Sequence, residues 1–169
     1  MSQPIVNRVA QSPLKVIDLM EYHSKGPRSV VDVAQWLEQG FILREKSYRV
    51  QLDAFDWSVY QNHFVAIQCT TDAILPSWAL LLVQSKLIGV AQQAIIGTLD
   101  DLEKILFTQQ LLRLDLSPYQ DAPVIVKGCS EKEIPQSAYA LLLDRLQSVA
   151  KKISFGEACS AVPIWMRNK

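Results

Sequence analysis

The C-terminal two thirds of the chain alternates short apolar runs with longer amphipathic stretches. The apolar, β-branched runs predict strands at residues 64–69, 94–97, 123–127 and 153–156. Hydrophobic residues at helical spacing predict helices from Pro76 to about Leu87, after the capping sequence Thr98–Asp101, and from Pro135 onward. Strands that alternate with helices in this way are typical of right-handed βαβ units. The pattern therefore predicts an α/β fold with a mostly parallel sheet flanked by helices.

The first sixty residues give a less regular pattern. Residues 14–19 read as another strand, and Ser29–Asp32 resembles a helix cap before an apolar stripe that ends at Gly40. Residues 44–55 fit both the strand period and the helix period, so the pattern leaves this segment open. No stretch resembles a flexible linker. We therefore expect residues 1–169 to form a single α/β domain, with residues 1–60 as an extension of it.

Composition and charge exclude several classes of protein. The 169 residues include 17 basic and 17 acidic side chains and are 49% hydrophobic, which is the composition of an ordinary globular domain. A balanced charge argues against nucleic acid or an anionic membrane surface as a partner, because both require a basic face. The chain starts without a signal-peptide pattern, and its most apolar stretch, residues 73–83, is too short to span a membrane. We expect a cytoplasmic protein.

Three cysteines share one local pattern. Cys69, Cys129 and Cys159 each follow a predicted strand, precede a serine or threonine directly, and precede a proline within seven positions. The helices after the first two, starting at Ser77 and Ser137, also resemble each other in sequence. This similarity indicates either a weak internal repeat or a coincidence of two leucine-rich helices.

A shared edge would bring these thiols together. Parallel strands place their carboxyl ends at one edge of a sheet, where ligands of α/β proteins bind. If the strand at 94–97 lies at an outer position, the other three strands become neighbours, about 4.8 Å apart. Thiolates prefer zinc, copper(I) or iron–sulfur centres. The pattern therefore predicts a site for zinc or iron, with a fourth ligand from Glu157, Asp72 or His23.

Four motifs carry a resemblance to a known family. These are Ile5-Val-Asn-Arg8, Asp56-Trp57-Ser58, Lys127-Gly-Cys-Ser130 and Gly156-Glu-Ala-Cys-Ser160. With them, the chain resembles the bacterial proteins grouped as domain of unknown function 2480, found mainly in Bacteroidetes. The family has no established activity. The resemblance implies a gene neighbourhood shared with iron–sulfur cluster assembly, and hence iron–sulfur assembly proteins as partners.

We therefore predict an accessory protein that handles a metal or an iron–sulfur cluster through Cys69, Cys129 and Cys159. The alternative is a non-catalytic interaction domain, a homodimer, whose cysteines are inert and buried. A thiol enzyme ranks third, because neither histidine is placed to act as a base for a cysteine. The prediction leans away from an enzyme.

Overall fold

The chain divides into two compact units. The computed structural model describes residues 13–128 and 134–168, so that Cys129 and the motif at residues 5–8 lie outside the described residues. Unit 1 contains Met1–Ser24 and Leu106–Lys169, and unit 2 contains Lys25–Ile105. Unit 2 is therefore inserted into the sequence of unit 1.

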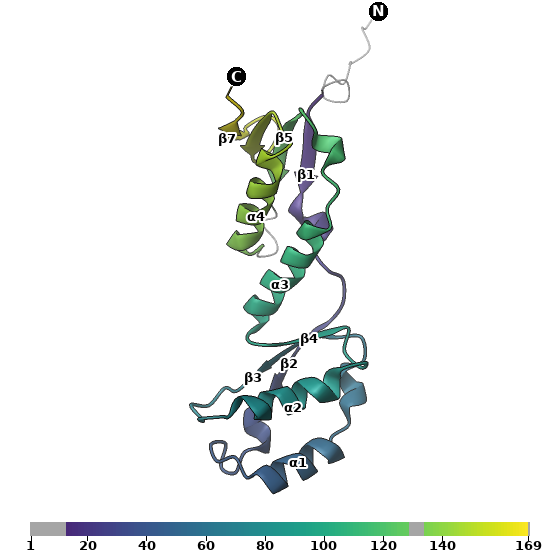
Figure 1. Ribbon diagram of the computed structural model, residues 1–169, viewed down its shortest axis with the longest axis vertical. Coiled ribbons are helices and arrows are strands. Elements are labelled where there is room, and N and C mark those ends of the chain that lie inside the picture. Colours follow the sequence, from purple (N-terminus) through teal and green to yellow (C-terminus); the bar gives the residue numbers. More distant parts are fainter. Residues whose placement is uncertain (1–12, 129–133, 169) are drawn as a thin grey trace, which may run out of the picture. The chain divides into compact units, whose positions relative to one another are not determined.

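Unit 1 is built on a four-stranded sheet with the strand order β1-β5-β6-β7. Its strands are β1 (Lys15–Asp18), β5 (Pro123–Lys127), β6 (Lys152–Phe155) and β7 (Val162–Met166). The first three are parallel to one another, and β7 is antiparallel to β6. Helix α4 (Gln136–Gln147) connects β5 to β6, and α3 (Leu99–Leu112) begins in unit 2 and ends in unit 1 (Figure 1).

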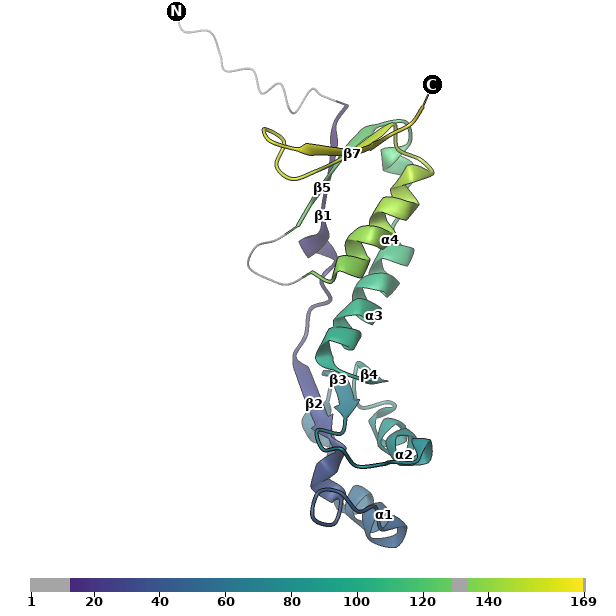
Figure 2. The same ribbon diagram turned by 90° about the vertical axis from the view of Figure 1, so that its left-hand side faces the viewer.

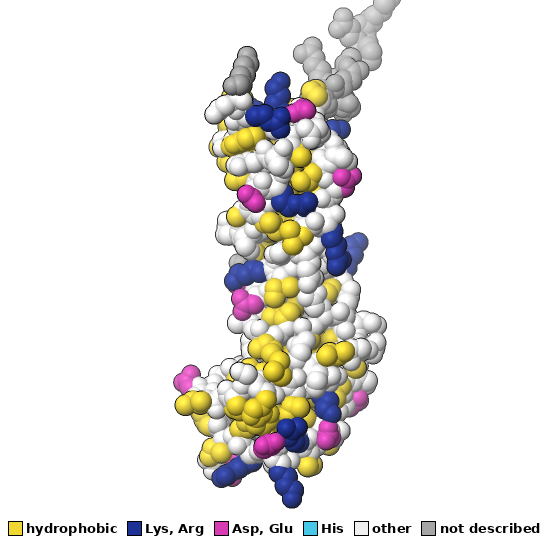
Figure 3. Space-filling view, in the orientation of Figure 1, with side chains coloured by type: hydrophobic (Ala, Val, Ile, Leu, Met, Phe, Trp, Pro, Cys, Tyr) yellow, Lys and Arg dark blue, Asp and Glu magenta, His cyan; other side chains and the backbone are white. Residues whose placement is uncertain are grey.

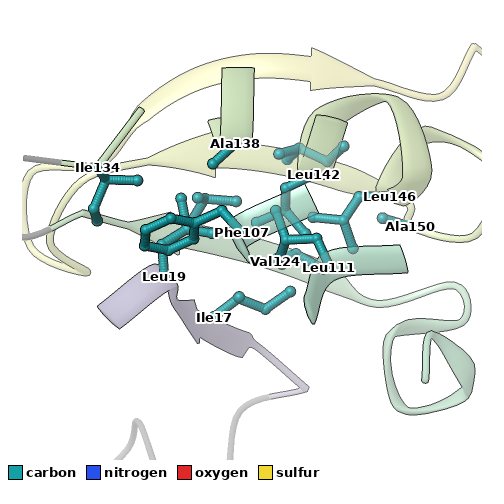
Figure 4. Close-up of a cluster of buried hydrophobic side chains, with 12 residues drawn as sticks. Ile17, Leu19, Phe107, Leu111, Val124, Ile134, Ala138, Leu142, Leu146 and Ala150 are labelled. Carbon is teal, nitrogen blue, oxygen red and sulfur yellow. The ribbon is translucent and has the colours of Figure 1, made fainter. Parts of the chain in front are cut away.

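The core of unit 1 lies between the sheet and these two helices. Ala138, Leu142 and Leu146 recur every four residues along α4, and all three are buried. They pack in one cluster with Phe107 and Leu111 of α3 and with side chains from the strands, as Figure 4 shows. Fully burying a leucine side chain contributes about 1.5–3 kcal/mol, so this stripe explains why α4 covers the sheet.

Unit 2 has a three-stranded parallel sheet with the strand order β2-β3-β4. Its elements are β2 (Arg28–Asp32), α1 (Glu45–Ala54), β3 (Phe64–Gln68), α2 (Ser77–Leu87) and β4 (Gln93–Ile96). Tyr48 and Leu52 of α1 and Val83 of α2 belong to its buried core. Figure 2 shows α1 and α2 beside the strands of this unit.

The points where the chain enters and leaves unit 2 are joined by an ion pair. Arg28, the first residue of β2, donates from Nε to Glu103 Oε1 of α3 at 2.6 Å and from Nη2 to Glu103 Oε2 at 3.2 Å. The Arg28 guanidinium also lies 5.0 Å from the centre of the Phe64 ring. Two parallel hydrogen bonds of this kind fix both distance and orientation.

The two units repeat one structural pattern. Residues 59 positions apart take the same place: Asn62 and Asp121 have φ angles of 62° and 54°, and each stands two residues before a central strand. Their backbone N–H groups donate to the carbonyls of Val90 and Val149, again 59 residues apart. The same spacing relates the prolines before α2 and α4, and the positive-φ glycines after β4 and β6.

The repeat is also visible in the sequence of a turn. Asp56-Trp-Ser-Val-Tyr-Gln-Asn62 corresponds to Asp115-Leu-Ser-Pro-Tyr-Gln-Asp121. In both copies the aspartate side chain accepts a hydrogen bond from the backbone N–H of the serine, at 3.0 and 2.9 Å. The structure therefore supports an internal repeat over a coincidence of two leucine-rich helices.

The α/β class, with mostly parallel sheets and βαβ units, is confirmed, but the strands belong to two sheets and not to one. The segment that the sequence left open, residues 44–55, forms α1. The helix expected after Ser29 is wrong: Arg28–Asp32 is a strand, and Asp32 caps only a short 3-10 helix at Val33–Trp36. The expectation of a single domain stays a prediction.

Strand β7 was not predicted, and α2 is buried on one face only. Helix α2 buries Ala79, Val83 and Leu87, whereas Leu81 is 56% exposed. Within residues 13–128 and 134–168, no helix is long and apolar enough to cross a membrane.

Candidate ligand-binding site

The carboxyl edge of the unit 1 sheet is formed by two neighbouring strand ends. Strand β5 ends at Lys127, strand β6 ends at Phe155, and the two strands are parallel partners. The loops after them therefore leave the sheet at the same edge. Ligands of α/β proteins bind outside this edge, because strand ends and helix starts converge there.

A cavity of about 520 Å³ opens beside this edge, between α4 and strands β5, β6 and β7. Val126, Leu143, Phe155 and Ile164 give it apolar walls, and Gln136 of the first turn of α4 adds a polar side chain. Ser154, the one polar residue among the buried described residues, also lines it. Cavities of this size and composition are typical of small-molecule sites.

Tyr139 forms the wall between the cavity and the edge. Its ring meets the Phe155 ring edge to face, with the two ring centres 5.6 Å apart. Its hydroxyl lies directly against Gly128, so that a Cβ atom at position 128 would overlap with the Tyr139 oxygen. The absence of a side chain at Gly128 is therefore what allows the tyrosine ring to reach the strand end.

Charged groups gather at the same edge. Lys127 Nζ lies 2.5 Å from Glu157 Oε2. The hydrogen bond to Glu157 raises the pKa of Lys127 against the opposing effect of burial, and the charges of Glu157, Asp18 and Cys159 add to it. Lys127 is therefore held as an ammonium ion next to the exposed thiol of Cys159.

The corresponding edge of unit 2 is closed by hydrogen bonds. Asp32 Oδ2 accepts from the Thr70 hydroxyl at 2.5 Å, and Asp32 Oδ1 accepts from the backbone N–H groups of Thr70 and Ala34. Burial alone would raise the pKa of Asp32, but these hydrogen bonds outweigh it and keep the pKa below its ordinary value. Thr71 continues the network by donating to the carbonyl of Gly40 at 2.6 Å.

The sequence profile of the family described as "Protein of unknown function (DUF2480)" matches residues 3–167. The chain belongs to the DUF2480 family. No curated protein and no solved structure matches it significantly. The match covers both units, so the repeat and the insertion lie within one DUF2480 chain.

The metal-handling function predicted for this DUF2480 chain is wrong. Cys69 follows β3 in the sheet of unit 2, whereas Cys159 follows β6 in the sheet of unit 1. Among the described residues, no group of three or more histidine, cysteine or acidic side chains could hold a metal ion. The prediction failed because it placed all strands in one sheet. Cys129 lies outside the described residues.

The expected fourth ligands are spread over both units. Glu157 is paired with Lys127, and the His23 ring packs against Phe107 with ring centres 6.0 Å apart. Asp72 lines a groove of unit 2. The alternative of inert, buried cysteines also needs correction, because Cys159 is exposed and Cys69 is only partly buried. The expected homodimer and iron–sulfur assembly partners stay predictions.

The sequence pattern did not predict the roles of Tyr139, which lines the cavity, and of Lys127, which is paired with Glu157 at the neighbouring strand end. In the sequence, Tyr139 falls within the helix predicted from Pro135 onward, and Lys127 ends the strand predicted at residues 123–127. The signal that could have found them is the pair of glycine motifs, since Gly128 and Gly156 each follow a strand of one βαβ unit.

A contact between Ser29 and His63 in the DUF2480 fold was also missed. Ser29 Oγ lies 2.7 Å from His63 Nδ1, although the two residues are 34 positions apart. Ser29 belongs to β2 and His63 immediately precedes β3, and these strands are parallel neighbours. The contact ties the starts of two strands at the amino edge, which is a structural role.

Proposed function

We propose that the protein binds a small organic molecule with an apolar body in the cavity between α4 and strands β5–β7. The observation that carries this proposal is the cavity itself, which lies beside the carboxyl ends of two parallel strands. The proposal assigns binding and no catalytic residue. We place the protein in the cytoplasm, which the free thiols of Cys69 and Cys159 support.

The lining favours a flat or ring-shaped ligand. The rings of Tyr139 and Phe155 stand at one end, and Leu143 and Ile164 provide aliphatic walls. Aromatic and aliphatic side chains in such a cavity contribute by burying apolar ligand surface. Gln136 and Ser154 give polar groups that orient the ligand.

The test is a substitution that fills the cavity without disturbing the core. Ala140 is an exposed residue of α4 that lines the cavity, so Ala140→Trp places an indole there. The matched control is Gln147→Trp, which adds the same ring at an exposed position of the same helix outside the lining. The probe is 1-anilinonaphthalene-8-sulfonate, titrated by fluorescence.

We expect Ala140→Trp to weaken binding of the probe by at least about tenfold and Gln147→Trp to leave it unchanged. Circular dichroism spectra of all three proteins check that they are folded. Equal affinity of the two variants, or a folded wild-type protein that does not enhance the fluorescence, would contradict the proposal.

A further inference from the structure

Unit 2 carries a second hollow of a different kind. It is an open groove of about 690 Å³ between the segment before α1 and the loop that leads from β3 into α2. Its lining includes Phe41, Ile42, Glu45, Asp72, Ile74 and Trp78. The groove is independent of the unit 1 cavity, since all of its residues belong to unit 2.

The groove exposes an unusual amount of apolar surface. Ile74 is 97% exposed and Phe41 is 56% exposed. Hydrophobic side chains also gather over α2, where Leu81 is half exposed (Figure 3). Contiguous apolar surface that faces water is typical of sites that bind another protein.

The two charged residues that line the groove are acidic. Glu45 and Asp72 line it, and no lysine or arginine is among its described lining residues. Arg49 compensates Glu45, because the two side chains form an ion pair at 2.9 Å and the Arg49 guanidinium lies over the Trp78 ring. Asp72 is exposed and has no ion pair within residues 13–128 and 134–168, so its carboxylate gives the groove lining its net negative charge.

This charge distinguishes between possible occupants. A second copy that used the same groove about a two-fold axis would bring the Asp72 side chains of both copies to one interface, and like charges there oppose association. A partner with a basic side chain next to apolar ones satisfies both the apolar lining and Asp72.

We propose that this groove is the docking site for a segment of another protein that presents apolar side chains next to a lysine or arginine. The apolar side chains cover Ile74 and Phe41, and the basic side chain pairs with Asp72. Amphipathic helices dock into apolar grooves in this manner in other proteins.

The test uses two labelled peptides of equal length and pattern, one of leucine and lysine and one of leucine and glutamate, and measures fluorescence anisotropy. Wild-type protein is expected to bind the lysine peptide at least about tenfold more tightly than the glutamate peptide. Ile74→Asp removes this binding, and Asp72→Lys reverses the preference. The control Val50→Asp changes an exposed residue of α1 outside the lining and leaves binding unchanged.

Equal binding of both peptides, or lysine-peptide binding that survives Ile74→Asp, would overturn the proposal. Sedimentation velocity of the wild-type protein and of Ile74→Asp measures whether each is a monomer or a dimer. If wild-type protein is a dimer and Ile74→Asp is a monomer, the occupant is a second copy and the proposal is wrong.

Discussion

The two units differ in the contacts made at the carboxyl ends of their corresponding strands. Asp18 and Asp32 each close the first strand of their unit and cap a 3-10 helix. In unit 2, the backbone N–H and the hydroxyl of Thr70 donate hydrogen bonds to the Asp32 carboxylate. In unit 1, Asp18 instead contributes its charge to Lys127, which is paired with Glu157 beside an exposed cysteine. The same scaffold thus carries one edge of satisfied hydrogen bonds and one edge of charged, accessible groups.

This difference indicates which parts of the repeat serve folding and which serve binding. The positions that the two units share fix the backbone conformation. They are the aspartates that cap 3-10 helices, the positive-φ residues before the central strand, and the prolines before the helices. The positions that differ lie at the carboxyl edges and in the hollows beside them. A repeat that keeps its scaffold and changes its edges is the arrangement expected when function is carried by loops.

The largest expected effect comes from the equivalent core leucines. Leu52 of unit 2 and Leu111 of unit 1 are 59 residues apart and almost fully buried. Leu52→Ala and Leu111→Ala should each reduce the free energy of unfolding by about 2–5 kcal/mol, because each leaves a cavity. Urea unfolding followed by tryptophan fluorescence measures this. In a Trp165→Phe background the remaining tryptophans all lie in unit 2, so the fluorescence then follows the unfolding of unit 2 alone.

An unchanged urea midpoint in either leucine variant would mean that the repeat does not extend to the core. The control is Leu112→Ala, a neighbouring residue of α3 that is 58% exposed and should change stability little.

A smaller effect is expected at another equivalent pair, Tyr48 and Phe107. The Tyr48 hydroxyl donates to the carbonyl of Ala79 at 2.9 Å, and burial, with the charge of Cys69, raises the pKa of Tyr48 to about 12. Tyr48→Phe should cost about 1–2 kcal/mol because it removes this buried hydrogen bond. It makes unit 2 resemble unit 1 at this position.

The pH dependence of Tyr48 has a definite sign. The unfolded chain loses the phenol proton near pH 10, whereas folded Tyr48 keeps it until about pH 12. Wild-type protein should therefore lose stability as the pH rises from about 10 to 12, and Tyr48→Phe should lose less. Absorbance titration at alkaline pH checks the pKa, and a Tyr48 that titrates near 10 would contradict the assignment.

At the edge of unit 2, Thr70→Val should reduce stability by at most about 1 kcal/mol, because the contact is near the surface. The lowered pKa of Asp32 means that its contribution is present at neutral pH and is lost as acid protonates the carboxylate. Urea unfolding of both proteins at pH 7 and in acid should therefore show a difference only at neutral pH. A difference that persists after Asp32→Asn would show that Thr70 acts through another contact.

The last prediction concerns the reactivity of the cysteines and not the stability of the fold. Cys159 is exposed beside Lys127, whereas Cys69 is partly buried and lies 3.4 Å from the Thr71 hydroxyl. In a Cys129→Ser background, iodoacetamide should alkylate Cys159 at least about tenfold faster than Cys69. Peptide mass spectrometry over time measures both rates, and equal rates would remove the distinction between the edges.

Local patterns predicted what local forces determine. The strands β3 and β5 and the helices α2 and α4 follow from short apolar runs and helical spacing. Residues 44–55 fitted both periods, and the structure chose a helix because Tyr48 and Leu52, four residues apart, share one buried face. Ser29–Asp32 was mistaken for a helix cap because Asp32 caps a 3-10 helix that follows a strand.

Long-range pairing could not be predicted from these patterns. Strands β1 and β5 pair with each other although the whole of unit 2 separates them in the sequence, and the residues of neither strand indicate which strand it pairs with. The candidate site depends on this pairing, since the cavity needs α4, β6 and β7 together. The metal site failed for the same reason, because Cys69 follows a strand of the unit 2 sheet and Cys159 follows a strand of the unit 1 sheet.

The ion pair between Arg28 and Glu103 affects the order in which the chain can fold. During synthesis, β1 emerges first, but its partner β5 follows only about 100 residues later. Unit 2 is continuous and can fold in the interval. Once Arg28 and Glu103 have met, the long loop between β1 and β5 is already closed at its base. The entropy that β1 and β5 lose on pairing is then that of a much shorter loop, so we expect a folded unit 2 to favour the folding of the unit into which it is inserted.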